Sequence, residues 1–317
     1  MTSIKKPAAL ALTLITVVSA IPMTSLAAHY NEWVEKDGKW YYYDYNGKKV
    51  KSNYAYDNAT GNYYVLDKTG ARVTAKGWYT LKQKNITYYG DKYYQTLKFY
   101  LKKGGAVTTG WKTLKDKEYY FYTTGEMAKS TSITKADGKY YVVGSDGAVI
   151  KKKGWVEAKY TSYSSFDGTK QKSVTWYYIK KTGEVYTGWK KIGKKKYYFY
   201  SNGVMAQRSV ISEYIDGKNV YRAIAADGTL ITKKGLHTVK YSSSYSSATF
   251  KSKTTSSFKV YVKKDGTLHY GLKTIKGKKY WFDPEMMRCN NKVVDGVRYY
   301  FGKTGACTRT EEVLGPK

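Results

Sequence analysis

Residues 110–128, GWKTLKDKEYYFYTTGEMA, and residues 188–206, GWKKIGKKKYYFYSNGVMA, decide the fold. Each stretch pairs a short Gly-Trp segment with an aromatic segment and then closes on a turn that contains glycine. Tyr and Phe favour β-strands, whereas Asn, Asp and Gly favour turns. The two stretches therefore predict β-hairpins, and units of this size bury an apolar face only by stacking on their neighbours.

The hairpin unit recurs along the chain at a regular spacing. Segments 102–111, 180–189 and 263–272 align with one another without a gap. This spacing indicates a large repeat of about 80 residues, which contains modules of about 20 residues. Inserts rich in Ser, Thr, Tyr and Lys follow three Gly-Trp or Gly-Leu pairs, which begin at residues 77, 154 and 235. We expect these inserts to lengthen their hairpins into polar, mobile arms.

The repeats predict an all-β fold, an elongated β-solenoid of stacked β-hairpin repeats preceded by a signal peptide. Beyond the first segment, the apolar residues do not recur at the period of an α-helix. The expected segments are a signal peptide at 1–27, N-terminal repeats at 28–76, and large repeats at 77–153, 154–234 and 235–317.

The N-terminal segment is typical of export. Lys5 and Lys6 precede an apolar run at 8–21 and the small-residue cleavage pattern Ser25-Leu26-Ala27. The apolar run is shorter than the roughly 20 residues of a membrane-spanning helix, so we expect no transmembrane segment. We therefore expect a secreted protein that associates noncovalently with the bacterial cell wall or surface; the sequence does not predict its oligomeric state.

The charge of the chain favours polyanionic partners. It carries 56 Lys and Arg against 24 Asp and Glu, a net charge of +32. Such a field attracts teichoic acids, acidic polysaccharides or nucleic acid, and the attraction weakens with salt. The alternative is a lysine-rich surface that is solvated without a specific partner. We expect a cell-wall polymer, teichoic acid or another anionic glycan, as partner, with host glycans as a further option.

The chemistry of an enzyme is not indicated by the sequence. His29, His237 and His269 are the histidines, and they form no metal or nucleophile motif. The carboxylates mostly occupy turn positions, where they stabilise turns. Cys289 and Cys307 either form a disulfide, which export permits, or remain two free thiols. We expect no catalysis, no metal and no cofactor.

The motif is a Gly-Trp pair, a few polar residues, an aromatic triplet and then Gly-x-Met or Gly-x-Ala. It resembles the bacterial cell-wall-binding repeats, which include choline-binding modules, streptococcal glucan-binding repeats and the C-terminal repeats of clostridial toxins. The resemblance covers almost all of the chain after the signal peptide. It implies a β-solenoid and a surface ligand.

The resemblance to choline-binding members implies a cage of two tryptophans, a tyrosine and often a methionine around a quaternary ammonium, held by cation–π attraction. We expect both tryptophans only in the first module, at Trp33 and Trp40. Later modules carry Glu118, Lys196 or Lys279 at the second position. This pattern favours carbohydrate over choline as ligand, because tyrosine faces stack on sugar rings.

The candidate ligand-binding residues are the aromatic residues of the modules and two methionines. They are Trp33, Trp40, Tyr42, Trp78, Trp111, Tyr120, Met127, Trp155, Trp189, Tyr198, Met205 and Trp281. Each also has a packing interpretation, which is favoured for Trp111 and Trp189 as core residues and for Met127 and Met205 as gap-fillers.

The predicted function is noncovalent binding of the cell wall or a surface glycan through multivalent repeats. Two alternatives stay open. The first is a structural or adhesive surface protein that binds polyanionic host or matrix polymers by charge. The second is recognition of choline-bearing teichoic acid.

Overall fold

The computed structural model describes residues 29–86, 90, 92–165, 167–247, 250–283 and 291–313, with the backbone alone for 241–247 and 250–256. These residues form strands and turns and contain no helix, so none of their elements is a helix able to cross a membrane. The prediction of an all-β fold is therefore confirmed. The expected signal peptide lies outside the described residues.

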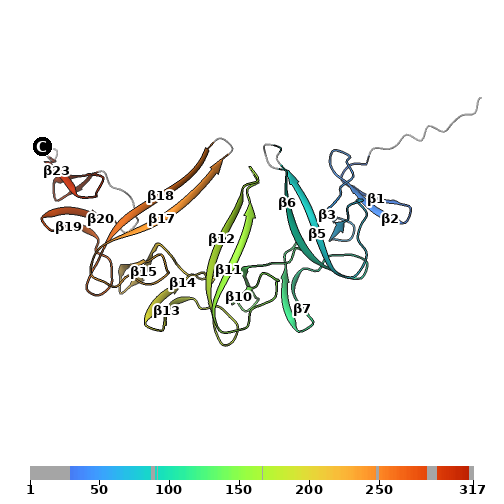
Figure 1. Cartoon of the computed structure of the whole chain (residues 1–317), viewed down its shortest axis with the longest axis horizontal. Coiled ribbons are helices and arrows are strands. Elements are labelled where there is room, and N and C mark those ends of the chain that lie inside the picture. The colour runs from blue at the N-terminus through green and yellow to red at the C-terminus, as the bar shows by residue number, and fades with distance from the viewer. Residues whose placement is uncertain are drawn as a thin grey trace, which may run out of the picture.

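The strands pair in chain order as antiparallel hairpins, and the hairpins follow one another along a curved array (Figure 1). The short hairpins are β1–β2 (Glu32–Lys36, Lys39–Tyr43), β3–β4 (Asn53–Asp57, Asn62–Leu66), β7–β8 (Gly110–Leu114, Lys117–Phe121), β9–β10 (Thr131–Thr134, Tyr140–Val143), β13–β14 (Gly188–Ile192, Lys195–Phe199), β15–β16 (Ser209–Ile215, Lys218–Ile224) and β19–β20 (Gly271–Ile275, Lys278–Phe282). A three-stranded sheet ends the array with β21 (Asn291–Val294), β22 (Val297–Phe301) and β23 (Cys307–Glu312).

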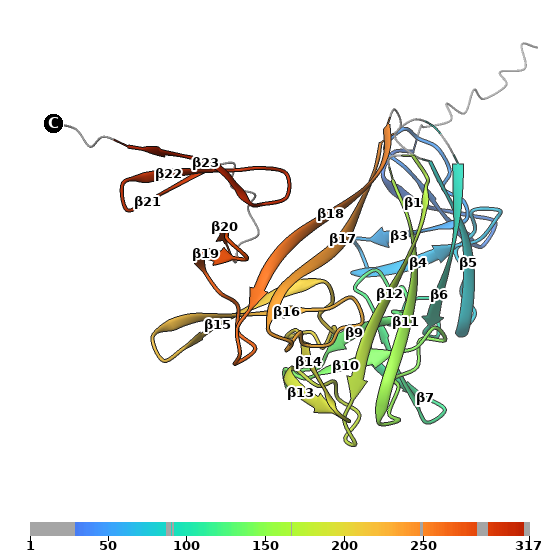
Figure 2. The ribbon, with the colours of Figure 1, turned by 60° about the vertical axis from the view of Figure 1, so that its left-hand side comes forward.

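Every third hairpin is long, as the polar inserts predicted. The long hairpins are β5–β6 (Gly77–Ile86, Lys92–Leu101), β11–β12 (Gly154–Tyr163, Lys170–Ile179) and β17–β18 (Gly235–Ser247, Phe250–Val262). They project as arms from the same side of the array (Figures 1 and 2). Near the ends of the first two arms, the ring of Tyr93 in β6 stacks on that of Tyr163 in β11, with centroids 5.5 Å apart.

The same backbone hydrogen bond joins successive hairpins along the array. The segment after each hairpin bonds back to the second strand of the hairpin before it, as when Met127 donates its N–H to the carbonyl of Lys98 at 2.8 Å. Met205 donates to Trp176 in the same way, also at 2.8 Å. The same bond joins Val107 to Tyr63, Val149 to Glu118, Val185 to Tyr140, Leu230 to Lys196 and Leu268 to Tyr221. The hairpins are therefore stacked by a repeated backbone contact and not only by their side chains.

The turn glycines explain why this stacking is close. Gly125 has a φ of 87°, a left-handed conformation that favours glycine, and a Cβ there would lie 2.4 Å from Cβ of Val107. Gly203 repeats the arrangement with a φ of 79° and 2.3 Å to Cγ2 of Val185. Any other residue at these turns would collide with the segment that follows the preceding hairpin.

The core recurs with the large repeat. Three equivalent clusters lie where each long hairpin meets the short hairpin before it. They are Val65, Leu81, Phe99, Leu101 and Val107; Val142, Ala158, Tyr177, Ile179 and Val185; and Ala223, Val239, Val260, Val262 and Leu268. Val65, Val142 and Ala223 lie before the expected repeat boundaries, and the rest of each cluster lies after them. The core is thus continuous across those boundaries, which stay a prediction.

Candidate binding sites between hairpins

A tryptophan from one hairpin and an aromatic residue from the next meet at several places along the array. Trp33 in β1 donates its Nε1–H to the carbonyl of Tyr56 at 3.1 Å, and its ring lies 5.8 Å from that of Tyr64. Trp111 in β7 lies 6.3 Å from Tyr141 in the same relation. We call each such place a joint and name it by its tryptophan.

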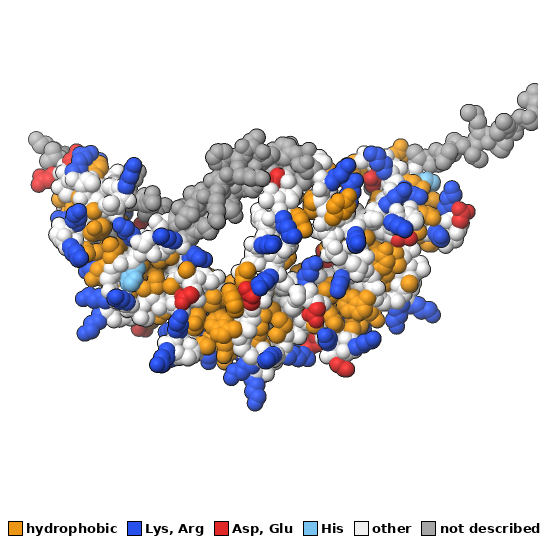
Figure 3. Space-filling view, viewed as in Figure 1, with side chains coloured by type: hydrophobic (Ala, Val, Ile, Leu, Met, Phe, Trp, Pro, Cys, Tyr) orange, Lys and Arg blue, Asp and Glu red, His pale blue; other side chains and the backbone are white. Residues whose placement is uncertain are grey.

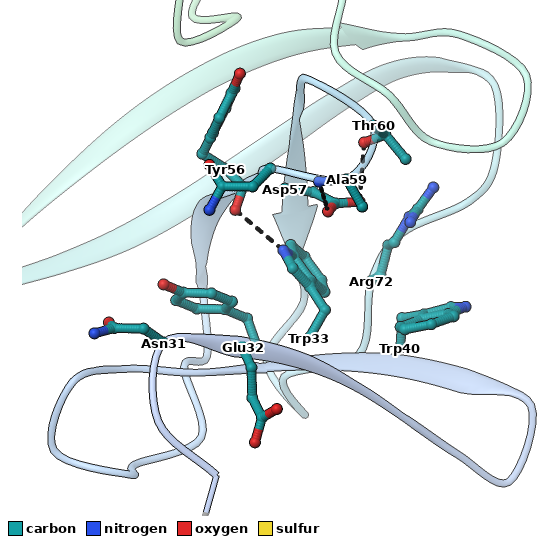
Figure 4. Close-up of a pocket in the computed structure, with 11 residues that line it drawn as sticks. Asn31, Glu32, Trp33, Trp40, Tyr56, Asp57, Ala59, Thr60 and Arg72 are labelled. Atoms are coloured by element: carbon teal, nitrogen blue, oxygen red, sulfur yellow. Dashed lines mark hydrogen bonds between the residues drawn. The ribbon is translucent and has the colours of Figure 1, made fainter.

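The Trp33 joint contains a pocket of about 450 Å³. Trp33 and Trp40 project from β1–β2 toward the turn that carries Asp57, Ala59 and Thr60 (Figure 4). The pocket is lined by Asn31, Glu32, Trp33, Trp40, Tyr42, Tyr56, Asp57, Asn58, Ala59, Thr60 and Arg72. It therefore brings together three predicted ligand-binding residues, Trp33, Trp40 and Tyr42.

The polar groups of this pocket are held in place. The Asp57 carboxylate accepts the backbone N–H of Ala59 at 3.0 Å and the hydroxyl of Thr60 at 2.9 Å. The guanidinium of Arg72 lies 3.3 Å from the ring centroid of Tyr64 and donates to the carbonyl of Gly104 at 3.0 Å. A cation that lines the pocket therefore covers Tyr64, which packs against Trp33, and the sequence did not indicate this arginine because it lies beyond the aromatic motif.

The Trp111 joint is filled by a lysine. The ammonium of Lys135 lies 4.9 Å from the ring centroid of Trp111 and 4.4 Å from that of Tyr141. It forms an ion pair with Glu118 at 2.7 Å, and Lys151 pairs with the same carboxylate at 3.1 Å. The hydrogen bond from Lys135, above all, holds the pKa of Glu118 below its usual range. Glu118 thus stands at the position of the second tryptophan and holds the ammonium of Lys135 by an ion pair.

The Trp189 joint is also filled by cations, from different positions. The ammonium of Lys196 lies 4.9 Å from the ring centroid of Trp189, and the guanidinium of Arg222 lies 5.7 Å from it. Arg222 is held in turn by an ion pair with Glu213. At the C-terminal end, Lys292 lies 5.1 Å over the ring of Trp281. Cations thus cover three of the predicted tryptophans.

The Trp155 joint carries a second complete set of aromatic residues. Trp155 is 39% exposed, and its ring lies 6.3 Å from that of Trp176 and 4.9 Å from that of Tyr197 in the next hairpin. Among the described residues, no lysine or arginine lies over Trp155 or Trp176. This joint is therefore open.

The open joint corrects one expectation. The first module is not alone in carrying two tryptophans, because Trp176 stands in β12 at the position that Trp40 has in β2. The insert of the long hairpin separates Trp176 from Trp155 in sequence and hides the pair. The run Trp176-Tyr177-Tyr178, which repeats Trp40-Tyr41-Tyr42, was the signal that could have found it.

The Trp78 joint is simpler. Trp78 is 48% exposed and lies edge-on to Tyr100 at 5.4 Å and to Tyr119 at 5.1 Å. Beneath it, Phe121 is fully buried, 5.9 Å from the indole. Lys98 occupies the position of the second tryptophan. This joint therefore offers one indole on a fixed aromatic base.

Three candidate tyrosines and two candidate methionines also pack within the array. Tyr42, Tyr120 and Tyr198 each lie across their own hairpin from its tryptophan, with ring centroids 5.4, 5.2 and 5.1 Å apart. Met127 and Met205 are each only 6% exposed, which favours the gap-filling interpretation. Trp111 and Trp189 are half-buried, and Trp189 packs against the core cluster of Ala206, Ile211 and Ile224, while Phe121 and Phe199 are the fully buried aromatic residues of those hairpins.

The other chemistry of the chain is sparse. Within the described ranges, no group of three His, Cys, Asp or Glu residues is placed to hold a metal ion. Cys307 is a free thiol there and donates to the carbonyl of Arg309 at 3.2 Å. Cys289, the other cysteine of the two alternatives, lies outside the described residues. Lysine and arginine side chains are spread over the visible face of the molecule (Figure 3).

Comparisons with known proteins agree with the repeat pattern. The family model described as "Putative cell wall binding repeat" matches residues 31–49, 109–127 and 187–205. Glucosyltransferase-I of Streptococcus downei is 28% identical over an alignment of 328 positions, which covers 86% of this chain and 19% of that protein. This chain thus spans about a fifth of that relative.

Solved structures of similar chains include two kinds of protein. One is choline binding protein F of Streptococcus pneumoniae, at 21% identity with 87% of this chain and 92% of that chain covered, and a TM-score of 0.34. Another is alternansucrase in complex with isomaltononaose, at 20% identity, with 87% of this chain and 18% of that chain covered and a TM-score of 0.37. The matched segments are hairpins β1–β2, β7–β8 and β13–β14 with their turns, so three hairpins of the array are cell wall binding repeats.

Proposed function

We propose that this protein is secreted and binds a glycan of the bacterial cell wall or surface noncovalently, through several joints and without catalysis. The pocket of the Trp33 joint is the observation that carries the proposal. Its volume of about 450 Å³ falls within the range of small-molecule sites, roughly 300–1,000 Å³. Its two tryptophans, Trp33 and Trp40, lie in the first segment that the family model matches.

The lining of this pocket suits a sugar. Trp33 and Trp40 offer flat apolar faces for the C–H surface of a ring, and Trp40 is 39% exposed. Asn31, Asn58 and Thr60 offer polar groups that can orient hydroxyls. Arg72 already places a guanidinium on Tyr64, so a cationic ligand would meet a like charge. A neutral or anionic glycan therefore fits this joint better than an ammonium.

Repetition supports a multivalent mode of binding. We propose that the stacked hairpins form an elongated β-solenoid, which presents its joints along one polymer. Weak sites joined on one chain gain avidity without new contacts, provided that the polymer can reach them together. The net charge of +32 supports an anionic wall polymer such as teichoic acid as partner.

A second candidate function rests on the open Trp155 joint. Two tryptophans and a tyrosine without a protein cation can attract a quaternary ammonium by cation–π interaction. A teichoic acid that carries such groups would use this joint, while the Trp33 joint would remain a sugar site.

The test is co-sedimentation with purified cell walls at about 0.15 M salt. The double variant W33A/W40A is expected to sediment less than the wild type, whereas Y45A, which removes a 73% exposed tyrosine outside the pocket, is expected to sediment normally. If the wild type stays in the supernatant, the proposed function is wrong.

Two further conditions separate the alternatives. Reversal by tetramethylammonium would favour the second candidate, since only an ammonium site responds to it. Binding that disappears at moderate salt for every polyanion, and that W33A/W40A leaves unchanged, would favour the charge-based adhesive protein instead.

A further inference from the structure

Two of the three segments that the family model matches contain joints already occupied by a cation of the chain. We propose that Lys135 and Arg222 are internal ligands of the Trp111 and Trp189 joints. They take the place of an external cation, so these joints bind no soluble ligand and connect successive hairpins instead. The inference goes beyond the proposed function, because it concerns the joints that take no part in ligand binding.

The position of Lys135 is that of a bound ligand. Its ammonium lies between rings from two hairpins, 4.9 Å from Trp111 and 4.4 Å from Tyr141, both within the roughly 6 Å of an effective cation–π contact. Glu118 supplies the counter-charge at 2.7 Å, and the Lys135 side chain is 24% exposed. Aromatic walls and a carboxylate around one ammonium are the components of a cation-binding site.

The backbone register shows why only this joint receives a lysine at that place. Trp111 donates its Nε1–H to the carbonyl of Thr134, and Lys135 is the next residue. The corresponding bond of Trp33 goes to Tyr56, so Asp57 is the counterpart of Lys135 in the Trp33 joint.

The same register assigns the counterpart in the Trp155 joint. Thr131 pairs with Val143 as Gly188 pairs with Phe199, which places Ile192 at the position of Lys135. An isoleucine supplies no cation, and this joint is open.

The Trp189 joint reaches the same result with other residues. By register, Arg222 stands where the Trp155 joint has Tyr197 and the Trp33 joint has Tyr64. Its guanidinium turns toward Trp189 at 5.7 Å and pairs with Glu213. Lys196 adds a second cation at 4.9 Å from the same ring. The Trp111 and Trp189 joints thus each hold a cation and a carboxylate, which come from different positions in the two joints. This is expected if these joints must be filled by a cation of the chain, whichever position supplies it.

Removal of the internal ligand tests the proposal. The variant K135A is expected to bind one tetramethylammonium ion per chain more than the wild type in isothermal titration calorimetry. The variant K135A/W111A is expected to lose that additional site. The control K139A removes a lysine of the same turn that pairs with Glu184 at 3.3 Å, and it should titrate like the wild type. A folded K135A that gains no site would overturn the proposal.

A second measurement decides the matter if K135A does not fold. Ring currents should move the ε-proton resonances of Lys135 upfield in wild-type NMR spectra, relative to those of Lys139. In W111A the shift should diminish. Unshifted Lys135 resonances in the wild type would overturn the proposal. Neither measurement depends on cell walls, so a failure to sediment with walls would leave this result standing.

Discussion

The Trp155 joint and the Trp111 joint share one frame and differ in what occupies it. Each tryptophan lies 5.2 Å from a tyrosine of its own hairpin, Tyr178 or Tyr120, and each joint is closed by the same backbone register. The differences lie at two positions. Trp176 and Ile192 leave the first joint open, whereas Glu118 and Lys135 fill the second.

The repeat motif therefore specifies how the hairpins stack, and it does not specify whether a joint is open. Segment 109–127, which contains the filled joint's Trp111 and Glu118, matches the family model, whereas the long hairpin that carries Trp155 and Trp176 lies outside all three matched segments. One residue of the second strand, two positions before the tyrosine that pairs with the tryptophan, and one residue from the next hairpin decide whether a joint is open. A joint can thus be open or filled without a change in fold.

The largest expected effect follows from breaking the frame that both joints share. The substitution G203A places a Cβ 2.3 Å from Val185 and keeps a left-handed φ of 79°. Strain of about 1–2 kcal/mol from φ and about 1–3 kcal/mol from overpacking add up to a destabilisation of about 2–5 kcal/mol. Urea and thermal unfolding measure it.

The matched control is G193A, at the tip of hairpin β13–β14. Gly193 also has a positive φ, 59°, but a Cβ there meets nothing within 4 Å. Its cost is expected to be about 1 kcal/mol, from backbone strain alone. Equal costs for the two variants would show that close stacking at the turns does not stabilise the array.

The second expected effect is on ligand binding. The double variant W155A/W176A removes both indoles of the open joint, whereas W111A removes one from a filled joint. If binding is multivalent, loss of one open site should lower apparent affinity for walls roughly tenfold. W111A should leave affinity within about twofold of the wild type, although it costs stability. Quantitative wall-binding isotherms distinguish these outcomes, and a larger loss for W111A would reverse the comparison.

Much of the fold follows from the sequence because hairpins are local. Alternating aromatic residues and turn glycines sit within one module, so residues 110–128 alone predict β7–β8. The three arms were also predictable, since inserts between two strand segments can only lengthen them. The contact of Tyr93 with Tyr163 was not, because it joins two arms through side chains distant in sequence.

The sites were harder to predict, because each joint takes residues from two hairpins. The motif identified Trp111 and Glu118, but not Lys135, which belongs to the following hairpin and resembles any other turn lysine in sequence. Trp176 was missed for the reverse reason, since an insert separates it from its partner Trp155. The spacing of a motif within a module carries no information about what the next module contributes.

A smaller effect is expected from converting one joint into the other. The variant W176E/I192K transfers the filled arrangement to the Trp155 joint, where the new lysine can reach the ring between hairpins. Because a filled joint binds no soluble ligand, affinity for walls should fall, at most as far as in W155A/W176A. The single variant I192L is the control. If wall binding and the tetramethylammonium titration both stay unchanged, positions 176 and 192 do not decide whether this joint is open.

The smallest expected effect is a pH dependence confined to the filled joint. Lys135 holds the pKa of Glu118 below the ordinary value of a glutamate, about 4.3. A depressed pKa in the folded state means that the Lys135–Glu118 pair stabilises the joint above the ordinary pKa, and that this contribution is lost as pH falls through the lowered value. The upfield shift of Lys135 should therefore persist from pH 7 to about 5 and diminish only below the ordinary range of a glutamate. In E118Q it should be smaller than in the wild type at pH 7 and independent of pH, because the amide cannot titrate. A Lys135 shift that titrates near pH 6 would show that a group other than Glu118 holds the lysine in the joint.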